Sequence, residues 1–280
     1  MVQISERLWL LGLLGDERVL RSPSPMMHEA ALKKAHLPGS YLPLVARAED
    51  LSAILAGLRA LNFQGLNVTA PLKEAVIPHL TGLSETAKAI GAVNTLVPTA
   101  AGYRGDNTDA PGFSRAYLAN LGQRKALIYG AGGAARAIIY ALRAQEIATT
   151  VVARNPQAAA KLAQEFGQTA APLAELGRLE PFPLVINATS ASYEKDLDPA
   201  PQIALTPEAL VIDINYGRPD NYWAALAALK GAAFQDGLPM LAHQAKLSFQ
   251  FWVGPTIEPD FATFEAALKL YVQNGLKVLR

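Results

Sequence analysis

The chain has 280 residues, 51% of them hydrophobic, and its 25 basic and 24 acidic side chains leave a net charge of +1. This composition predicts a folded protein of one or two domains with a sizeable core, and it argues against disorder. No block of charge stands out, so neither nucleic acid nor a membrane is an expected partner. The absence of cysteine excludes disulfides, thiolate catalysis and zinc-finger sites, and it fits the cytoplasmic location that we expect.

The first predicted element is a strand at residues 8–15, "LWLLGLLG", which is a short apolar run. Gly12 and Gly15 break this run and no cleavage-like site follows it, so we interpret it as a buried strand rather than a signal peptide. No other segment of the sequence approaches the roughly 18 apolar residues that a membrane-spanning helix needs.

The next hundred residues alternate between helical and strand-like patterns. The stretch "SPMMHEAALKKAHL" predicts a helix with Ser24 as its N-cap and Pro25 at the first helical position. The other elements expected here are strands at 40–46 and 65–69, a helix at 49–63, a short helix from residue 85, and two strands joined by a turn at 99–102.

The pattern of apolar residues changes near Pro111, and after this point continuous apolar stretches that predict strands alternate with helical patterns. Strands of this kind are typical of a sheet that is covered by helices on both faces, and the alternation predicts parallel sheets. The expected elements are a helix at 113–122, a strand–turn–helix–strand unit at 125–155, strand-like stretches at 183–190, 209–216 and 232–237, a helix at 222–230, and helices from 238 to the end.

The strongest local signal is the turn in "LIYGAGGAARA", which follows an apolar strand and opens a helix. Gly130, Gly132 and Ala135 match the dinucleotide-binding pattern G-x-G-x-x-G/A. Gly130 permits a tight turn, Gly132 lets the backbone approach a pyrophosphate, and Ala135 lets the helix and strand pack closely. The alternative interpretation is an ordinary strand-to-helix turn.

The residues after the following strand, "ATTVVA", indicate which dinucleotide is bound. An NAD site often has an acidic residue there for the ribose 2′-hydroxyl, but this chain has Arg154 and Asn155. A guanidinium suits a 2′-phosphate, which favours NADP over NAD. The alternative is a solvated surface arginine. A dinucleotide with no sign of flavin or metal suggests hydride transfer.

We therefore expect an α/β fold of two domains. A substrate-binding α/β domain would comprise residues 1–110 together with 239–280, and a Rossmann-like, doubly wound domain at 111–238 would bind the dinucleotide.

Polar groups at the ends of predicted strands indicate where the first domain would bind a substrate. They are Ser22, Ser24, Asn67, Thr69, Lys73, Asn94, Thr95, Asp106, Asn107, Thr108 and Asp109. Hydroxyls, amides, one lysine and a carboxylate together suit a hydroxylated, weakly acidic small molecule. Each residue alone has a structural alternative, since serine can cap a helix, asparagine can hold a loop and lysine is usually solvated.

Eight segments occur in an order that one known family shares: "SPSP", "NVTAPLK", "IGAVNTL", "GDNTDAPGF", "GAGGAARA", "NATS", "DINY" and "GLPMLAHQ". With them the chain resembles the shikimate dehydrogenase family over nearly its whole length. The motifs around the lysine, Asn94 and Asp109 are far more specific than the glycine turn. The resemblance implies two domains and the NADPH-dependent, reversible reduction of 3-dehydroshikimate to shikimate.

The resemblance also implies roles for single residues. Lys73 and Asp109 would be the catalytic acid/base pair, sharing a proton, and would also contact the substrate. The other substrate-binding residues would be Ser22 and Ser24 on the carboxylate, Tyr216 near it, and Thr69, Asn94 and Gln244 on ring hydroxyls. The cofactor, NADP with NAD as the alternative, would contact Gly130, Ala131, Gly132, Gly133, Ala134, Arg154, Asn155, Ile214 and Gly237.

The chain departs from the family pattern at the rims of both expected sites. The loop "DERVLR" is about one residue longer before the serines, "NATSAS" lacks the usual Gly-Met, "GRPDNY" replaces the usual Pro and Thr, and Ala110 replaces a glycine. These changes leave two alternatives open: a paralogue that acts on quinate, aminoshikimate or another cyclic polyol with NAD or NADP, and a non-catalytic sensor of shikimate-like ligands or a nucleotide.

Other enzyme classes lack their motifs in this sequence. The four histidines are scattered without metal-ligand spacing, so no metal site is expected, and no G-x-S-x-G nucleophile elbow occurs. The expected partner is a small-molecule substrate, and the expected assembly is a monomer or a homodimer.

Overall fold

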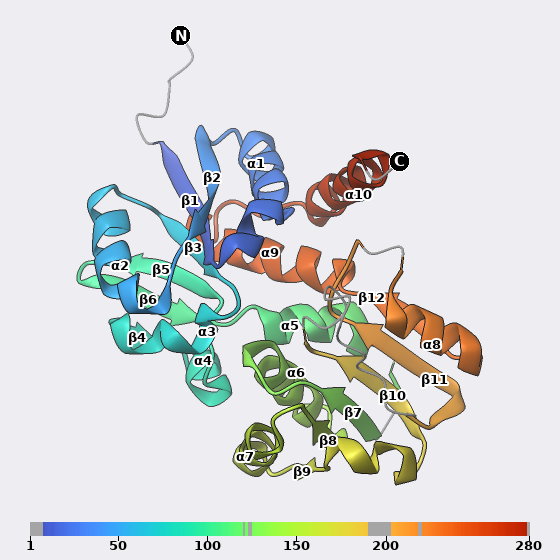
Figure 1. The fold of residues 1–280 in the computed structure, drawn as a ribbon. Helices are drawn as coiled ribbons and strands as arrows, with labels where there is room; N and C mark the ends of the chain where they lie inside the picture. The colour runs from blue at the N-terminus through green and yellow to red at the C-terminus, as the bar shows by residue number, and fades with distance from the viewer. Residues whose placement is uncertain (1–7, 120, 123–124, 190–202, 218–219, 279–280) are drawn as a thin grey trace. The chain divides into compact units, whose positions relative to one another are not determined.

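The computed structural model describes residues 8–119, 121–122, 125–189, 203–217 and 220–278 (Figure 1). The chain divides into two units, which are Met1–Gly112 with Ala242–Arg280 (unit 1) and Phe113–Leu241 (unit 2). In the described residues each unit contains one six-stranded sheet, and the predicted two-domain α/β class is confirmed. No helix in these ranges has the length and apolar character that crossing a membrane requires.

The sheet of unit 1 is mixed. Its strands, in spatial order, are β2 (Gly39–Val45), β1 (Trp9–Gly15), β3 (Gly65–Val68), β5 (Thr95–Thr99), β6 (Gly102–Asp106) and β4 (Gly82–Leu83). The first three are parallel, but β5 runs antiparallel to both β3 and β6. The prediction of two strands joined by a turn at 99–102 is confirmed, because this short turn closes the antiparallel hairpin of β5 and β6.

Short helical segments connect these strands, and two long helices complete the unit. The segments are η1 (Glu17–Arg21), α1 (Ser24–Lys34), η2 (Ala48–Asp50), α2 (Leu51–Ala60), α3 (Leu72–Ala75), η3 (Ile77–His79), α4 (Glu85–Ile90) and α5 (Asp109–Phe113), followed late in the chain by α9 (Leu238–Val253) and α10 (Phe261–Val278). Helix α1 packs against α10, which brings the two ends of the chain into one unit.

The predicted cap of α1 is wrong by one position. Ser24 is the first helical residue, Pro23 precedes it as the capping residue, and no side chain caps the helix from that position. Instead, the hydroxyl of Ser22 accepts a hydrogen bond from the backbone N–H of Ser24 at 3.2 Å. A serine hydroxyl can satisfy a free helix N–H from just outside the first turn, so Ser22 takes the role expected of Ser24.

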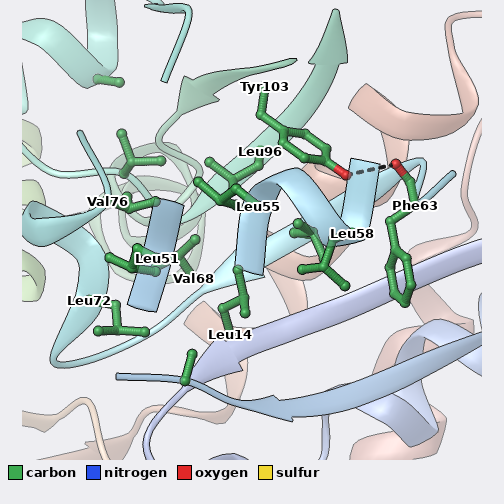
Figure 2. Packing of buried hydrophobic residues seen from close by; sticks show 14 residues of the cluster. Leu14, Leu51, Leu55, Leu58, Phe63, Val68, Leu72, Val76, Leu96 and Tyr103 are labelled. Carbon is green, nitrogen blue, oxygen red and sulfur yellow. Dashed lines mark hydrogen bonds between the residues drawn. The ribbon is translucent and has the colours of Figure 1, made fainter. Parts of the chain in front are cut away.

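A hydrophobic cluster joins α2 to the sheet of unit 1 (Figure 2). Its buried members are Leu14, Ala46, Leu51, Leu55, Leu58, Phe63, Leu66, Val68, Leu72, Val76, Ala87, Val93, Leu96 and Tyr103. At its edge the hydroxyl of Tyr103 donates to the backbone oxygen of Phe63 at 3.1 Å, as Figure 2 shows. Because Leu72 and Val76 belong to this cluster, burial of apolar surface holds the short helix between them.

The sheet of unit 2 is parallel throughout its described pairs. In spatial order its strands are β12 (Ala233–Asp236), β11 (Leu205–Asp213), β10 (Phe182–Asn187), β7 (Lys125–Tyr129), β8 (Ala148–Val152) and β9 (Thr169–Ala170). Read from β9, the chain order of the strands is 3-2-1-4-5-6, which is the doubly wound dinucleotide-binding arrangement. The connections include α6 (Gly133–Arg143), α7 (Pro156–Phe166), η5 (Leu173–Arg178) and α8 (Tyr222–Lys230).

The helix predicted at 113–122 begins earlier than expected. Helix α5 starts at Asp109, and a π-helical segment, η4 (Ser114–Leu118), continues it. Asn107 explains the early start, because its side-chain oxygen accepts hydrogen bonds from the backbone N–H groups of Asp109 and Ala110 at 3.0 and 3.2 Å. Asp109 therefore lies in the first turn of a helix, where a carboxylate is favoured by the helix dipole.

Candidate functional site

The position of Lys73 is set by the backbone on both sides of it. Helix α3 follows β3 directly, and the N–H of Leu72 bonds to the oxygen of Thr69 at 2.9 Å. The backbone oxygen of Lys73 itself accepts a hydrogen bond from Val93 at 2.8 Å. With Leu72 and Val76 packed in the core, the lysine side chain is left on the opposite, polar side of the helix.

Lys73 and Asp109 form a close ion pair. The ammonium nitrogen lies 2.7 Å from Oδ2 of the carboxylate, and the two side chains are only 15% and 7% exposed. Mutual attraction between opposite charges is stronger at such a shielded position than on an open surface. An amine and a carboxylate that share a hydrogen bond can give a proton to, or take one from, a third group placed beside them.

Asn94 joins this pair to three further side chains. Its Nδ2 donates to Asp109 Oδ1 and to Thr108 Oγ1, each at 2.9 Å, and to Gln244 Oε1 at 3.3 Å. Its Oδ1 accepts the backbone N–H of Thr108 at 2.7 Å and the hydroxyl of Thr95 at 3.0 Å. The amide is therefore held from both ends, with its donor side toward the carboxylate.

Helix α9 supplies two polar side chains one turn apart, Gln244 and Ser248, and both are buried. Gln244 contacts Asn94, and Ser248 hydrogen-bonds to Asn67, Thr95 and Thr108. The helix comes close enough for these contacts because of glycine at position 112. A Cβ atom there would lie 2.9 Å from that of Gln244.

Two buried aromatic rings, those of Tyr41 and His28, lie next to Asn67. The hydroxyl of Tyr41 donates to Asn67 Oδ1 at 2.8 Å, and the ring of His28 stacks on that of Tyr41 with centroids 4.4 Å apart. Burial lowers the pKa of His28 to about 3, and the nearby Asn67 side chain opposes this shift. Burial likewise raises the pKa of Tyr41 well above its usual value, and the side chain of Ser24 opposes it. Both rings are therefore neutral at physiological pH.

The structure brings together four of the residues to which we assigned roles: Lys73, Asp109, Asn94 and Gln244. Ser22 and Ser24 form a second group, with their hydroxyl oxygens 3.0 Å apart. Thr69 follows β3 and is partly buried; its backbone N–H bonds to Leu14. Tyr216 belongs to unit 2.

Sequence reasoning noted Asn67, Thr95 and Thr108 as polar residues but gave them no role, and it missed Ser248 and Tyr41. A signal for Ser248 was present, because residues four apart on a helix share one face and Ser248 lies four positions after Gln244. No local pattern identifies Tyr41, since its partner Asn67 lies on a different strand.

The glycine turn of unit 2 has the geometry that its motif requires. Gly130 has a φ of +128°, and a Cβ there would lie 2.9 Å from the backbone oxygen of Ala188. Gly132 caps α6 without any side-chain hydrogen bond, and among the described residues no side chain and no backbone beyond its chain neighbours lies within 4 Å of the place where its Cβ would be. The backbone is thus open at Gly132, at the start of α6, as an anion-binding helix terminus requires.

The two residues after β8 differ in their environment. Arg154 is exposed, and its guanidinium makes no ion pair within the described ranges of the chain. Asn155 caps α7, because its side-chain oxygen accepts the N–H of Ala158 at 3.0 Å. The arginine is available to an anionic ligand, whereas the asparagine side chain already has a structural partner.

A buried carboxylate organises the loops at the carboxyl ends of β10 and β11. Asp213 accepts hydrogen bonds from the side chains of Asn187, Asn215 and Asn221 at 2.8, 2.8 and 2.6 Å. Gly237 packs against the same loop, since a Cβ there would lie 1.9 Å from the backbone oxygen of Ile214. Two predicted cofactor residues, Ile214 and Gly237, are thus in contact.

Parts of two motifs cannot be placed. Residues 190–192 of "NATSAS" and residues 218–219 of "GRPDNY" lie outside the described residues.

Family models match both parts of the chain. Residues 14–96 match the model of the shikimate dehydrogenase substrate-binding domain, and residues 113–229 match the model of shikimate/quinate 5-dehydrogenase. A curated relative, an NADP⁺ shikimate dehydrogenase of Thermus thermophilus, is 40% identical over 254 residues, which cover 90% of this chain and 94% of the relative.

Solved structures agree with these matches. Shikimate 5-dehydrogenase from Thermus thermophilus, solved with NADP(H) and shikimate, is 38% identical with a TM-score of 0.82, covering 94% of this chain and 99% of that one. Quinate dehydrogenase from Corynebacterium glutamicum, solved with NAD, is 30% identical with a TM-score of 0.81 at 94% and 99% coverage. Sequence identity is thus higher to the shikimate enzyme.

Proposed function

The chain belongs to the shikimate dehydrogenase family, and we propose that it catalyses the reversible, NADPH-dependent reduction of 3-dehydroshikimate to shikimate. The observation that carries this proposal is the shielded ion pair of Lys73 and Asp109, 2.7 Å apart, with the amides of Asn94 and Gln244 beside it. A binding protein without catalysis would not need an amine and a carboxylate in this arrangement, which counts against the sensor alternative.

The acid/base chemistry follows from the pair. NADPH, held by unit 2, would supply the hydride for the ketone carbon, and the oxygen that becomes negative needs a proton from the protein. Lys73 in its ammonium form donates this proton, and in the reverse direction the neutral amine accepts one from the shikimate hydroxyl. Asp109 orients the lysine through its Oδ2 and accepts the Asn94 amide at its Oδ1. Such acid/base assistance typically contributes about 10² to 10⁴ in rate.

The substrate ring would be held by hydroxyl and amide groups of unit 1. Thr69, Asn94 and Gln244 would bind ring hydroxyls, and the paired hydroxyls of Ser22 and Ser24 would bind the carboxylate. These groups suit an uncharged polyol ring with one acidic substituent because they offer both donors and acceptors but no permanent charge. We also assign Tyr216, from unit 2, to the carboxylate, on the basis of the family motif alone.

The cofactor would be held by unit 2, whose residues fit a dinucleotide. The turn from Gly130 through Ala134, with open space at Gly132, suits the pyrophosphate, and the exposed guanidinium of Arg154 suits the 2′-phosphate that distinguishes NADP from NAD. Ile214 and Gly237 would also contact the cofactor, and Asn155 would contribute through groups other than its capping oxygen. We place this activity in the cytoplasm, where a chain without cysteine needs no disulfide.

The test is the absorbance change at 340 nm with purified protein in four mixtures: shikimate or quinate, each with NADP⁺ or NAD⁺. We expect turnover to be fastest with shikimate and NADP⁺. Preference for quinate would refute the substrate assignment, preference for NAD⁺ would refute the cofactor assignment, and tight binding of shikimate with no turnover in any mixture would favour a sensor.

A further inference from the structure

The hydroxyl of Ser248 links two groups of polar side chains in unit 1. It lies 2.9 Å from Asn67 Nδ2, 2.8 Å from Thr95 Oγ1 and 3.0 Å from Thr108 Oγ1, and the residue has no exposed surface. One serine on α9 thus contacts polar groups of β3, of β5 and of the segment just before α5. None of these three partners is among the residues that we assign to the substrate or the cofactor.

The direction of the hydrogen bonds is determined by Asn67. Its Oδ1 accepts the hydroxyl of Tyr41, so its Nδ2, which can only donate, faces Ser248. Ser248 must therefore accept from Asn67 and use its own hydrogen for one of the two threonines. That threonine is then free to donate its hydrogen onward.

The onward acceptor is Asn94. Its Oδ1 lies 3.0 Å from the hydroxyl of Thr95 and 3.2 Å from that of Thr108, in addition to the backbone N–H of Thr108. Because these hydrogen bonds fix the position of Oδ1, the Nδ2 group of the same amide points toward the carboxylate of Asp109. A continuous set of hydrogen bonds therefore runs from Tyr41 through Ser248 to the ion pair, and its members support one another because each is buried.

We propose that Ser248 is a positioning residue for the acid/base pair: acting through Thr95 and Thr108, it holds the Asn94 amide so that Asp109 stays aligned with Lys73. This inference rests on the proposed function, to which it adds a residue that touches neither substrate nor cofactor. It also explains why α9 carries a hydroxyl rather than an apolar side chain in a fully buried position.

The first test is Ser248→Ala. Losing one hydrogen bond that orients the pair should lower kcat roughly threefold to tenfold and raise the KM for shikimate, while the KM for NADP⁺ stays unchanged. Thr95→Val, which removes the next hydroxyl with little change in volume, should act in the same way. It also keeps the test valid if Ser248→Ala does not fold.

The decisive measurement is a double-mutant cycle with Asn94→Ala. If Ser248 acts through Asn94, Ser248→Ala should lower kcat by less than about twofold in the Asn94→Ala background, although it lowers kcat severalfold in the unmodified protein. Equal effects in the two backgrounds would overturn the proposal, because a purely structural role would weaken both proteins alike.

The matched control is Tyr103→Phe, which also removes a buried hydroxyl from unit 1 but leaves this network intact (Figure 2). It should lower the melting temperature and leave kcat unchanged. Absence of turnover in the unmodified protein would overturn both the proposed function and this inference. Normal turnover in the unmodified protein and an equal kcat in Ser248→Ala would overturn the inference alone.

Discussion

Lys73 and Asp109 are 36 positions apart in the sequence, yet the lysine nitrogen lies 2.7 Å from a carboxylate oxygen of the aspartate. The lysine sits on a four-residue helix that two core side chains hold in place, and the aspartate begins a helix that Asn107 caps. The pair is thus formed by two short helix starts, each held by its own local contacts.

Replacing the lysine tests the pair directly. Lys73→Ala should lower kcat by about 10² to 10⁴, because the proton donor is lost, and should leave NADPH binding unchanged. Steady-state rates at 340 nm and a fluorescence titration with NADPH measure the two quantities. Lys88→Ala, which removes an exposed lysine of α4, is the control and should behave as the unmodified protein. Near-normal turnover in Lys73→Ala would exclude this lysine from the mechanism.

Replacing Arg154 tests the preference for NADP. Arg154→Ala should weaken NADPH binding roughly 10-fold to 100-fold, since charge-assisted hydrogen bonds to a phosphate are lost, and should change NADH binding little. The test is to measure the dissociation constants of NADPH and NADH for the unmodified protein and for the variant. Arg143→Ala, an exposed arginine at the end of α6, serves as the control. Equal losses for NADPH and NADH would make Arg154 a structural residue.

His28 predicts a dependence of stability on pH. Its pKa is about 3 in the folded protein and 6.5 when unperturbed, so between these values the unfolded chain binds a proton that the folded chain does not. The free energy of unfolding should therefore fall as the pH is lowered from about 6.5 toward 3, by up to about 1.4 kcal/mol per pH unit from this residue.

The His28→Leu variant, which is similar in volume and cannot titrate, should reduce this slope in urea unfolding curves recorded between pH 7 and pH 4. His79→Gln, at an exposed position, should keep the slope of the unmodified protein. An unchanged slope in His28→Leu would show that other groups cause the acid sensitivity.

Substitution by alanine should have opposite effects on stability at two glycines. Gly237→Ala should destabilise unit 2 by several kcal/mol and weaken NADPH binding, because its Cβ would overlap the backbone of Ile214. Gly57→Ala, in the exposed middle of α2 with no atom near the new Cβ, should stabilise the protein by about 0.5 to 1 kcal/mol. Thermal melts with and without NADPH measure both, and a tolerated alanine at 237 would contradict the close contact.

The order of the elements and the two-domain α/β class could be predicted from sequence, because hydrophobic periodicity and glycine turns are local signals. The hairpin of β5 and β6 could be predicted because its turn is short. The antiparallel pairing of β3 with β5 could not, since the direction in which distant strands pair depends on their neighbours rather than on their own residues. The start of α5 was placed four residues late because Asn107 looked like a loop residue rather than a cap.

By itself the sequence determined which chemical groups are present and on which elements they lie: the lysine after β3, the glycine turn after β7 and the arginine after β8. Tertiary structure alone decided which of them meet. The contact of Lys73 with Asp109, and the route from Tyr41 through Ser248 to Asn94, join residues from six separate elements and the loops between them. Hydrogen bonds act only over about 3 Å, so partners that are distant in the chain become partners only after the strands and α9 have packed.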